Sequence, residues 1–536
     1  MKYIFVSGGV ISGIGKGIAT SSISLLLKSA GYRVVPIKMD PYLNVDAGTM
    51  NPFAHGETFV LDDGKETDQD LGHYERFLNQ SLNSTNIVTQ GGIYLSVIQK
   101  ERNLEYDGDY VDIHNITQEI IQRVHLAGES AKADIVVIEI GGTAGEYQNV
   151  LFLEANRLMK LKNPEDVLHV HITYLPIPAS IGEMKSKPAQ MSVRDLHAVG
   201  IQPDILLARA EVAIDEPRKK RLSFNTGIDE KDIIPSPDVK NIYEIPLNYE
   251  AAGLTDRILG KLGLKRKKSD LSQWKKFVDK AKAAKRKVKI GIVGKYFSIG
   301  DFTLADSYIS VIEAIRHASF SQLLQPEITW LDSGKVEQEE KILKGFQGII
   351  VPGGFGSRDI EGKILAIKYC RENNIPYFGL CYGMQLASVE FARNILGYKD
   401  ANTTEVDPKT KYPVIHIMPD QEKKLLERNY GATMRLGAWD CKLKEGSTVR
   451  NLYGKADISE RHRHRYEFNN DYREEVEKHG LKISGTSPDG NLVEIVELEN
   501  HPFFVGTQFH PELKSRPLAP HPLFVGFIQA ASKVKV

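Results

Sequence analysis

A cysteine stands between two glycines in the second half of the chain. The segment Gly379-Leu380-Cys381-Tyr382-Gly383 follows an apolar run and precedes an amphipathic one. It is the thiol form of the G-x-S-x-G turn, in which small flanking residues let a strand bend sharply into a helix. The N-terminus of that helix favours the thiolate. We therefore predict that Cys381 is a nucleophile, and that Cys370 and Cys441 are buried structural cysteines.

A nucleophilic cysteine needs a base, and the base needs a group that orients it. His510 and Glu512 lie two residues apart in FFVGTQFHPE, so on a strand end their side chains point to the same side. We expect His510 to move the proton and Glu512 to hold its imidazole.

The run IIVPGGFG predicts an oxyanion hole. Its glycines, Gly353 and Gly354, allow a backbone N–H to point at a developing oxyanion, together with the N–H of Tyr382. A plain β-turn is the alternative interpretation of the same residues.

A second reaction centre is indicated at the N-terminus, where YIFVSGGVISGIGKG reads as a strand, a glycine-rich loop and the start of a helix. Backbone N–H groups of such a loop close on phosphate oxygens, and Lys16 would add a charge at the β- and γ-phosphates. The match to the P-loop motif is imperfect, because Gly17 stands where a magnesium-binding hydroxyl is expected. A glycine-rich turn without a ligand is the alternative.

Two acidic residues are candidate magnesium ligands. Asp70 ends the acidic segment DDGKETDQD, and Glu139 lies near the end of the strand ADIVVIEIGG. Ligands bind at that edge of open parallel sheets, and carboxylate oxygens suit Mg²⁺. Lys38, at the end of another strand, would stabilise a phosphoryl group in transfer. Taken singly, acids such as these are more often only solvated surface residues.

A basic loop, GEMKSKPAQ, carries Lys185 and Lys187 beside a proline. Two lysines there could hold a second polyphosphate, although exposed lysines are usually only surface residues.

The elements that position these residues are predicted from apolar β-branched runs that alternate with amphipathic stretches, a pattern typical of parallel α/β sheets. A basic segment with helical spacing of Leu271, Trp274, Phe277, Val278 and Ala281 divides the pattern. We predict a first domain over 1–265, a linker with an amphipathic helix over 266–288, and a second domain over 289–536. A solvated surface helix would explain the same segment.

Composition excludes several classes of protein. The 536 residues carry 69 Lys and Arg against 69 Asp and Glu, which argues against a general nucleic-acid or membrane-surface binder. The three cysteines form no disulfide framework and no zinc motif. No apolar run is long enough for a membrane span, and the N-terminus reads as a strand rather than a signal peptide. We expect a cytoplasmic protein.

The combined motifs resemble the CTP synthase family over essentially the whole chain. The markers include YIFVSGGVISGIGKG, the long segment from Lys38 to Phe77, VIEIGGTAGE, GEMKSKPAQMSVRDLHAVGIQPD, VPGGFGSRDIEGKI, FGLCYGMQ, MRLGAWD, RHRHRYEFNN and FHPE. The resemblance implies an α/β protein of two domains. The first is an amidoligase domain with a P-loop-type, mostly parallel sheet, and the second is a class I glutamine amidotransferase.

The resemblance also implies the reaction. Glutamine would be hydrolysed through a thioester on Cys381, and the ammonia would pass through an internal channel. ATP with Mg²⁺ would phosphorylate the 4-oxygen of UTP, and ammonia would displace the phosphate to give CTP. The family is typically a homotetramer that is inhibited by CTP and activated by GTP.

Site residues carry over by position. His55 is expected near the channel entrance, and Asp70 and Glu139 on magnesium. Residues expected to bind ATP are Gly13, Ile14, Gly15, Lys16, Gly17, Ile18 and Asp70. Residues expected to bind UTP or CTP are Ser12, Glu146, Tyr147, Gln148, Lys185, Ser186, Lys187, Pro188, Ala189, Gln190 and Lys220. Residues expected to bind glutamine are Gly354, Tyr382, Gly383, Met384, Gln385, Glu405 and Arg465.

Some segments depart from the family pattern. GGTVGDIES becomes GGTAGEYQN, with Gln148 in place of an acid; KERRGDYLG becomes KERNLEYDG, with Asn103 in place of an arginine; and PHIT becomes HNIT, with Asn115 in the second position. About four residues are inserted near GKYFSIGDFTLADSY. These changes leave open how CTP and GTP regulate the protein. They also leave two other hypotheses, an amidoligase with a different acceptor and a binding or filament-forming protein without turnover.

Overall fold

A computed structural model describes residues 1–51, 56–294, 298–299, 302–303, 305–356, 359–418, 421 and 433–535. The chain forms two compact units. The first contains Met1–Ala47 and Asp70–Val278, and the second contains Gly48–Gln69 and Asp279–Val536. Both units are α/β, which confirms the predicted fold class. The predicted domain limits at 265 and 289 stay a prediction.

The first unit is built on a parallel sheet of seven strands in the order β5-β2-β6-β1-β7-β8-β9. The strands are β1 (Lys2–Gly8), β2 (Val34–Asp40), β5 (Ile87–Thr89), β6 (Ile135–Ile140), β7 (Val167–Tyr174), β8 (Ile205–Ala210) and β9 (Ile233–Pro237). These strands are buried almost throughout, as expected for a parallel sheet with helices on both faces.

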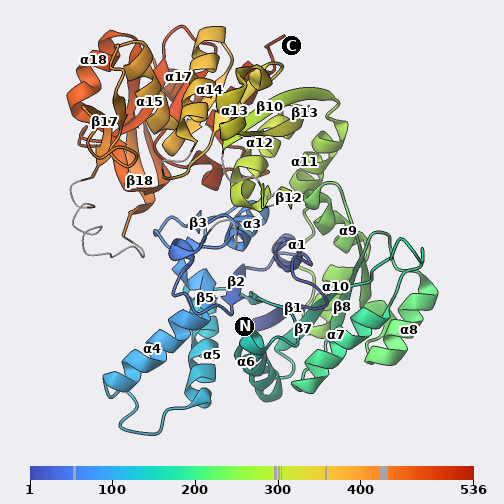
Figure 1. The fold of residues 1–536 in the computed structure, drawn as a ribbon. Coiled ribbons are helices and arrows are strands. Elements are labelled where there is room, and N and C mark those ends of the chain that lie inside the picture. Colours follow the sequence, from blue (N-terminus) through green and yellow to red (C-terminus); the bar gives the residue numbers. More distant parts are fainter. Residues whose placement is uncertain are drawn as a thin grey trace. The chain divides into compact units, whose positions relative to one another are not determined.

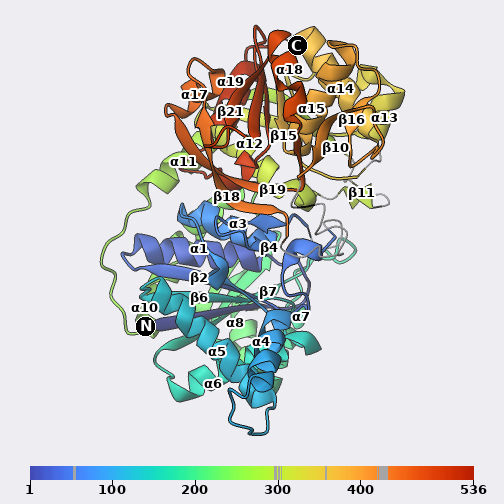
Figure 2. The same ribbon diagram turned by 90° about the vertical axis from the view of Figure 1, so that its left-hand side faces the viewer.

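Helices cover the two faces of this sheet (Figures 1 and 2). They are α1 (Lys16–Ser29), α3 (Gln69–Leu78), α4 (Gln90–Arg102), α5 (Ile113–Ser130), α6 (Val150–Lys162), α7 (Lys187–Ala198), α8 (Glu216–Thr226), α9 (Ile245–Ala251) and α10 (Leu254–Lys261). Along β1, Ile4 and Val6 pack with α1, α9 and α10, whereas Tyr3 and Phe5 pack with α5 and α6. Figure 2 shows the strands between α1 on one side and α5 and α6 on the other.

The second unit contains a nine-stranded mixed sheet in the order β13-β10-β14-β15-β23-β22-β21-β18-β19. The first five strands are parallel and the last four antiparallel. They are β10 (Arg286–Gly294), β13 (Leu324–Asp332), β14 (Gly348–Val351), β15 (Tyr377–Leu380), β18 (Arg435–Leu443), β19 (Asp457–His464), β21 (Leu481–Thr486), β22 (Val493–Leu498) and β23 (Phe504–Thr507).

Shorter strands complete the second unit. They are β3 (Phe59–Val60), β4 (Glu66–Thr67), β11 (Ser298–Ile299), β12 (Phe302–Thr303), β16 (Ala401–Thr403), β17 (Tyr412–Ile417) and β20 (Tyr466–Phe468).

The helices of the second unit pack on the two faces of the large sheet through two hydrophobic clusters, one on each face. One cluster contains α13 (Ser333–Gln338), α14 (Ile360–Asn373), α15 (Tyr382–Asn394) and α18 (Arg473–Lys478). The other contains α12 (Ile309–Ser321), α17 (Thr448–Tyr453) and α19 (Pro522–Ala531). The chain thus places β15 in the middle of the sheet, with its carboxyl end leading directly into α15.

The basic segment that separates the strands of the two sheets in the sequence contains a helix, α11 (Ser272–Ala283). Its apolar side is packed in the first unit, because Trp274 is 2% exposed and donates a hydrogen bond from its indole N–H to the carbonyl of Tyr243 at 2.9 Å. The ring of Trp274 lies 5.1 Å from that of Phe77. Over the described residues, no helix combines the length and apolar character that a membrane crossing needs.

Candidate active sites

The predicted nucleophile lies at the tight turn between β15 and α15. Cys381 has φ 49° and ψ −98°, a conformation that a non-glycine residue adopts only under strain. Its amide N–H donates to the carbonyl of Thr507 at 2.7 Å. The flanking glycines are required by space, because a Cβ on Gly379 would lie 2.6 Å from the hydroxyl of Tyr377, and one on Gly383 would lie 2.1 Å from the carbonyl oxygen of Val351.

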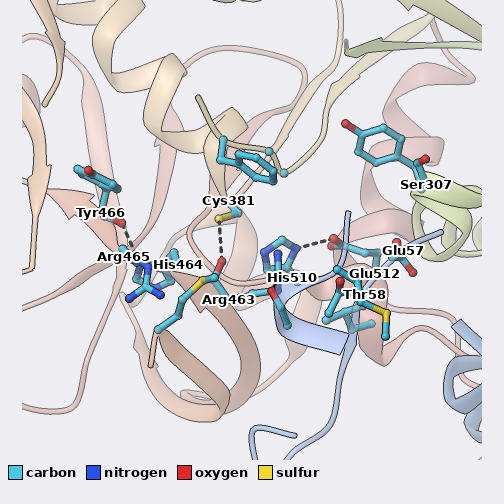
Figure 3. A pocket seen from close by; sticks show the side chains of 18 of the residues that line it. Glu57, Thr58, Ser307, Cys381, Arg463, His464, Arg465, Tyr466, His510 and Glu512 are labelled. Atoms are coloured by element: carbon cyan, nitrogen blue, oxygen red, sulfur yellow. Dashed lines mark hydrogen bonds and ion pairs between the residues drawn. The ribbon is translucent and has the colours of Figure 1, made fainter. Parts of the chain in front are cut away.

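The predicted base and its orienting acid lie beside this cysteine (Figure 3). Nδ1 of His510 donates to Oε1 of Glu512 at 2.7 Å, so Nε2 is the nitrogen that can serve the sulfur. Burial opposes protonation of the imidazole, but the carboxylate of Glu512 and the sulfur of Cys381 outweigh it and raise the pKa of His510 well above its usual range. The two neighbours therefore favour the protonated imidazole of His510.

The other two cysteines have the surroundings predicted for them. Cys370 and Cys441 are 0% and 1% exposed, and burial raises the pKa of both thiols. Neither thiol is therefore a candidate nucleophile.

The predicted oxyanion loop follows β14. A Cβ on Gly353 would lie 2.8 Å from Cε1 of His510 and 3.8 Å from Cβ of Cys381, so only glycine lets this loop approach both residues. Tyr382 follows Cys381, and its hydroxyl donates to the carbonyl of Gly356 at 2.9 Å. The loop and the first turn of α15 therefore meet at the nucleophile.

These residues open into a cavity of about 840 Å³ within the second unit. Of the residues predicted for catalysis or glutamine binding, the cavity is lined by Gly354, Cys381, Gln385, Glu405, Arg465, His510 and Glu512. Glu405 accepts the backbone N–H of Gly356 at 2.6 Å, and the guanidinium of Arg465 donates to Gln421 at 2.7 Å. In contrast, Tyr382 and Met384 are 1% and 0% exposed and belong to the hydrophobic core.

The cavity also contains residues that the sequence interpretation missed. Arg463 places its backbone carbonyl 3.8 Å from the sulfur of Cys381, and His464 lines the cavity (Figure 3). Glu57 and Thr58 line it as well, from the segment before β3. The motif RHRHRYEFNN carries the first two, but nothing in its spacing indicates that it faces a cysteine more than 80 residues away.

In the first unit, the glycine-rich loop joins β1 to α1 as predicted. Gly13 and Gly15 have φ of 68° and 93°, the left-handed region that glycine tolerates. Ser12 is exposed at the loop tip, Ile14 is buried, and Ile18 lies in the first turn of α1. The ammonium of Lys16 donates to the carbonyl of Gly142 at 2.7 Å.

Arg209 contacts this loop through a hydrogen bond and was not predicted from the sequence as a site residue. Its guanidinium donates to the carbonyl of Ile14 at 2.7 Å and its Nε to Asp238 at 3.0 Å. Arg209 is near the carboxyl end of β8. Glu139 was predicted because ligands bind at the carboxyl ends of parallel strands, and Arg209 could have been predicted for the same reason.

The two predicted magnesium ligands meet at one lysine. The ammonium of Lys38 pairs with Glu139 at 2.8 Å and also with Asp70. Burial raises the pKa of Glu139, and the nearby Asp70 adds to the effect. Burial acts in the same direction on Asp70, but Lys38 dominates and lowers the pKa of that carboxyl. A dense group of buried charges thus faces the phosphate loop.

The carboxylates fit a magnesium ion that is bound together with a nucleotide. Mg²⁺ is usually held by one or two carboxylates, with phosphate oxygens and water as the other ligands. Within the described part of the chain, no group of three or more His, Cys, Asp or Glu residues is arranged to hold a metal alone. A Cβ on Gly17 would lie 2.0 Å from Oδ1 of Asp70, so this carboxylate reaches the position where the P-loop hydroxyl is expected.

The predicted pyrimidine-nucleotide residues lie in three places: Ser12 on the glycine-rich loop, a group at α7 and α8, and a group after β6. Ser186 is the N-cap of α7, which begins with Lys187, Pro188, Ala189 and Gln190. Lys185 precedes it and pairs with Glu183 at 2.7 Å. Lys220 is exposed on α8, and Arg218 of the same helix donates to the carbonyl of Met184 at 2.9 Å. The two helices pack together through a shared hydrophobic cluster.

Glu146, Tyr147 and Gln148 follow the end of β6. Glu146 accepts from the hydroxyl of Thr143 at 2.7 Å and from the amide of Gln148 at 3.3 Å. Tyr147 is 96% exposed. The amide at Gln148 thus orients the remaining carboxylate.

Two further residues that differ from the family pattern, Asn115 and Asn103, each lie at one end of a helix. Asn115 accepts the backbone N–H of Asp112 at 3.0 Å in the capping box that starts α5. Asn103 follows α4 at an exposed position. His55 and most of the inserted region near 295–304 lie outside the described residues.

Comparison with known proteins gives a consistent result. The family model described as CTP synthase N-terminus matches residues 2–264, and the model described as glutamine amidotransferase class-I matches residues 303–530. The chain is 49% identical to a CTP synthase of Staphylococcus aureus (strain NCTC 8325), over 99% of this chain and 99% of that protein. It is 48% identical to a CTP synthase of Bacillus subtilis (strain 168), over 99% and 98%.

A solved structure is also similar in sequence. It is the glutaminase domain of Trypanosoma brucei CTPS with bound acivicin, which is 38% identical over 46% of this chain and 95% of that domain, with a TM-score of 0.43.

Proposed function

Because the chain belongs to the CTP synthase family, we propose that it catalyses the ATP-dependent amination of UTP to CTP with nitrogen from L-glutamine. The observation that supports this most strongly is the presence of two different reaction centres in one chain. One combines Cys381 with the hydrogen-bonded pair His510 and Glu512. The other combines a phosphate loop with Lys38, Asp70 and Glu139.

In the first centre, the thiolate of Cys381 attacks the side-chain amide carbon of glutamine. The C–S bond forms, and the backbone N–H groups near Gly354 and Tyr382 stabilise the oxyanion. His510 then gives its proton to the leaving nitrogen, and the C–N bond breaks to release ammonia. Water, deprotonated by His510, hydrolyses the thioester and returns the sulfur as a thiolate. Glu512 keeps the imidazole oriented through both steps.

In the second centre, the 4-oxygen of UTP attacks the γ-phosphorus of ATP, with ADP as the leaving group. Ammonia adds to C4 of this phosphorylated intermediate and phosphate leaves, which gives CTP. The loop at Gly13–Ile18 and Lys16 hold the ATP phosphates, and Lys38 neutralises the transferring group. Asp70 and Glu139 would hold Mg²⁺, which would neutralise charge at the phosphates when bound.

The two steps need to be coupled. A carbonyl oxygen is a poor leaving group until it is phosphorylated, and ammonia released to neutral water would be protonated and lost as a nucleophile. We therefore propose that ammonia passes from the first centre to the second without equilibrating with solvent.

Membership of the family also supports a proposal about regulation and assembly. We propose inhibition by CTP at a site that includes Glu146 and Gln148, activation by GTP, and a homotetramer. The residues proposed for the pyrimidine nucleotide are those that begin α7, with Ser12 and Lys220. The amide of Gln148 beside Glu146 leads us to expect CTP inhibition of altered strength.

The test is direct. Incubation with UTP, ATP, Mg²⁺ and glutamine is expected to produce CTP, followed by its absorbance. Cys381→Ala is expected to abolish glutamine-dependent synthesis by at least 100-fold, because the nucleophile is lost, and to spare synthesis from added ammonia. Absence of CTP with either nitrogen source would refute the proposal. Release of ADP with another nucleoside triphosphate in preference to UTP would favour a different acceptor.

A further inference from the structure

Three groups surround the sulfur of Cys381. The imidazole of His510 is one of them (Figure 3). The backbone carbonyl of Arg463 lies 3.8 Å from the sulfur, and the side-chain nitrogen Nε2 of Gln508 lies 3.5 Å from it. A carbonyl accepts the S–H of a thiol but repels a thiolate. The charged form of the nucleophile therefore gains from a second neighbour that donates, and Gln508 is placed to be one.

Gln508 is held in a fixed position. It follows β23 directly and is 1% exposed. Its backbone N–H donates to the carbonyl of Glu494 at 2.8 Å. The side chain thus projects from a strand end and is itself buried, and a hydrogen bond from a buried donor to a charge is strong.

The direction in which the Gln508 amide points follows from chemistry. The carbonyl of Tyr466 can only accept, so the group of Gln385 that faces it at 2.8 Å is the NH₂ group. His464 donates to the same carbonyl from Nδ1 at 2.9 Å and fixes it from another side (Figure 3). The NH₂ of Gln385 also lies 3.2 Å from the side-chain oxygen of Gln508. The remaining side of Gln508, its own NH₂, must then face the sulfur.

We propose that Gln508 is a further catalytic residue of the glutaminase, and that its amide N–H donates a hydrogen bond to the thiolate of Cys381 in the free enzyme and again when the sulfur leaves the thioester. This inference rests on the proposed glutaminase activity. In the attack, the electron pair of the sulfur forms the C–S bond and the hydrogen bond weakens. When water cleaves the thioester, the pair returns to the sulfur and Gln508 again donates to it. No proton passes to or from Gln508.

Gln385 is the positioning residue in this arrangement. It orients the amide of Gln508 by one N–H and is itself oriented by the backbone of Tyr466. Gln385 also lines the cavity. The same side chain can therefore serve the substrate and the nucleophile.

The test uses the full-length protein with Gln508→Met, which keeps the length of the side chain and removes the donor, and Gln508→Glu, which adds a negative charge. The rate at which iodoacetamide alkylates Cys381 is measured against pH, with modification located by mass spectrometry. We expect the midpoint of the profile to move up by about one pH unit in Gln508→Met, the loss of one hydrogen bond to a charged group, and further in Gln508→Glu. Glutaminase kcat is expected to fall about tenfold.

The matched control is Gln347→Met. Gln347 belongs to the same unit and precedes β14, at the end of the parallel strands opposite to the end where Cys381 follows β15. Its amide donates to the carbonyl of Val534 at 2.8 Å. Its alkylation profile is expected to equal that of the parent. Synthesis of CTP from ammonia reports the other reaction centre and is expected to stay within twofold of the parent in all these variants.

An unchanged alkylation profile in Gln508→Met, with glutaminase kcat within twofold of the parent, would overturn the proposal. Should Gln508→Met fail to fold, the profile of Gln385→Met decides, because loss of the orienting donor is expected to shift the midpoint in the same direction by a smaller amount. A parent protein that lacks glutaminase activity would refute the proposed function instead, and the alkylation profiles would still report whether Gln508 contacts the thiolate.

Discussion

At the scale of single residues, the phosphate loop shows how the absence of a side chain can define a site. P-loops usually carry Ser or Thr after the lysine, and its hydroxyl binds magnesium. Here that position is Gly17, and the space a Cβ would fill is within 2.0 Å of Oδ1 of Asp70. A carboxylate oxygen therefore lies where the hydroxyl is expected. Under the proposed function, residues from two separate segments would supply the magnesium ligand that one motif supplies elsewhere.

This geometry gives a prediction in which restoring the motif damages the protein. Gly17→Ser is expected to push the carboxylate of Asp70 aside and to lower ATP-dependent CTP synthesis at least tenfold with either nitrogen source, because Asp70 no longer reaches the phosphates. Glutaminase activity, measured as glutamate released, is expected to remain. Gly260→Ser is the control, since a Cβ there meets open space. Full synthesis in Gly17→Ser would contradict the role given to Asp70.

The residues that sequence could predict are those in local motifs. The turn around Cys381 and the pair His510 and Glu512 each follow from spacing within a few residues, and the structure brings them together. Gln508 stands two residues before His510 and was missed. Its role depends on Gln385 and on the carbonyl of Tyr466, which are distant in the chain, and no periodicity reports such a contact.

At the scale of secondary structure, a chain of buried hydrogen bonds joins four elements beneath the phosphate loop. Asn156 of α6 donates to Nδ1 of His169, so Nε2 of His169 carries the proton and donates to the hydroxyl of Ser7 at 2.7 Å. Ser7 then donates to Nδ1 of His171 at 2.8 Å, and Nε2 of His171 donates to Ser192 of α7. The amide of Asn156 thus determines which atom donates in each of the following hydrogen bonds.

Both histidines must be neutral for this chain to form. Burial lowers the pKa of His169 well below its usual range, and burial lowers the pKa of His171 to about 3. Ser7 precedes the glycine-rich loop, and Ser192 lies on the helix whose N-terminal residues are proposed to bind UTP. These hydrogen bonds thus tie the loop proposed for ATP and the helix proposed for UTP to two neighbouring strands, β1 and β7.

A pH dependence of stability follows. Above pH 6.5 these histidines are neutral in the folded and the unfolded chain. As pH falls below 6.5, the unfolded chain takes up protons that the folded chain excludes, so stability is lost until the folded-state values are reached, near pH 3 for His171. Each histidine is expected to contribute a slope of about 1.4 kcal/mol per pH unit in this window.

The measurement is urea unfolding between pH 6.5 and 5, followed by the fluorescence of Trp274 in a chain with Trp330→Phe and Trp439→Phe. Trp274 then reports the first unit alone. In His171→Gln, the free energy of unfolding is expected to change less steeply with pH, by about 1.4 kcal/mol per pH unit, because one titrating group is lost. The variant is also expected to be less stable at pH 7. Equal slopes in the two proteins would show that His171 takes up a proton in the folded chain as readily as in the unfolded chain.

Elements themselves were predictable where their pattern is local. Apolar runs bounded by glycine correctly indicated strands such as β1, β6 and β15, and the helix α11 follows from its spacing of apolar residues. The antiparallel part of the second sheet was not predicted. Strands β18, β19, β21 and β22 alternate polar and apolar residues, and their order depends on pairing between distant segments.

At the scale of the whole molecule, the order of the chain and the grouping of its contacts differ. Residues Gly48–Gln69 belong to the second unit, although Asp70, the next residue, belongs to the first. The fully buried guanidinium of Arg461 donates to Asp62 at 2.6 Å, and Arg463 donates to Glu66 at 2.8 Å. Both arginines lie on β19, where they alternate with His462 and His464 and so face the opposite side from them.

The two faces of β19 therefore make different contacts. One face binds the segment that leads to the proposed magnesium ligand, and the other carries His464, which fixes the carbonyl of Tyr466. The backbone between them contributes the Arg463 carbonyl beside the nucleophile. The sequence RHRHR predicts two faces by its alternation, but the partners of the arginines lie about 400 residues earlier and could not be predicted from it.

The pair of Arg463 and Glu66 gives the last prediction. The Glu66 side chain is 1% exposed, and removal of one partner from a buried pair leaves a charge without compensation. Glu66→Gln is expected to lower the stability of the second unit by about 3 kcal/mol. Urea unfolding followed by Trp330 and Trp439, in a chain with Trp274→Phe, measures this unit alone.

A double-mutant cycle separates the pair from its surroundings. Arg463→Met removes the charge but keeps the backbone carbonyl near the sulfur. If the two side chains act on each other, the double variant is expected to lose clearly less stability than the sum of the two single variants. Additive losses would mean that Glu66 is held by other contacts, and that the segment before Asp70 joins the second unit through Arg461 and Asp62 instead.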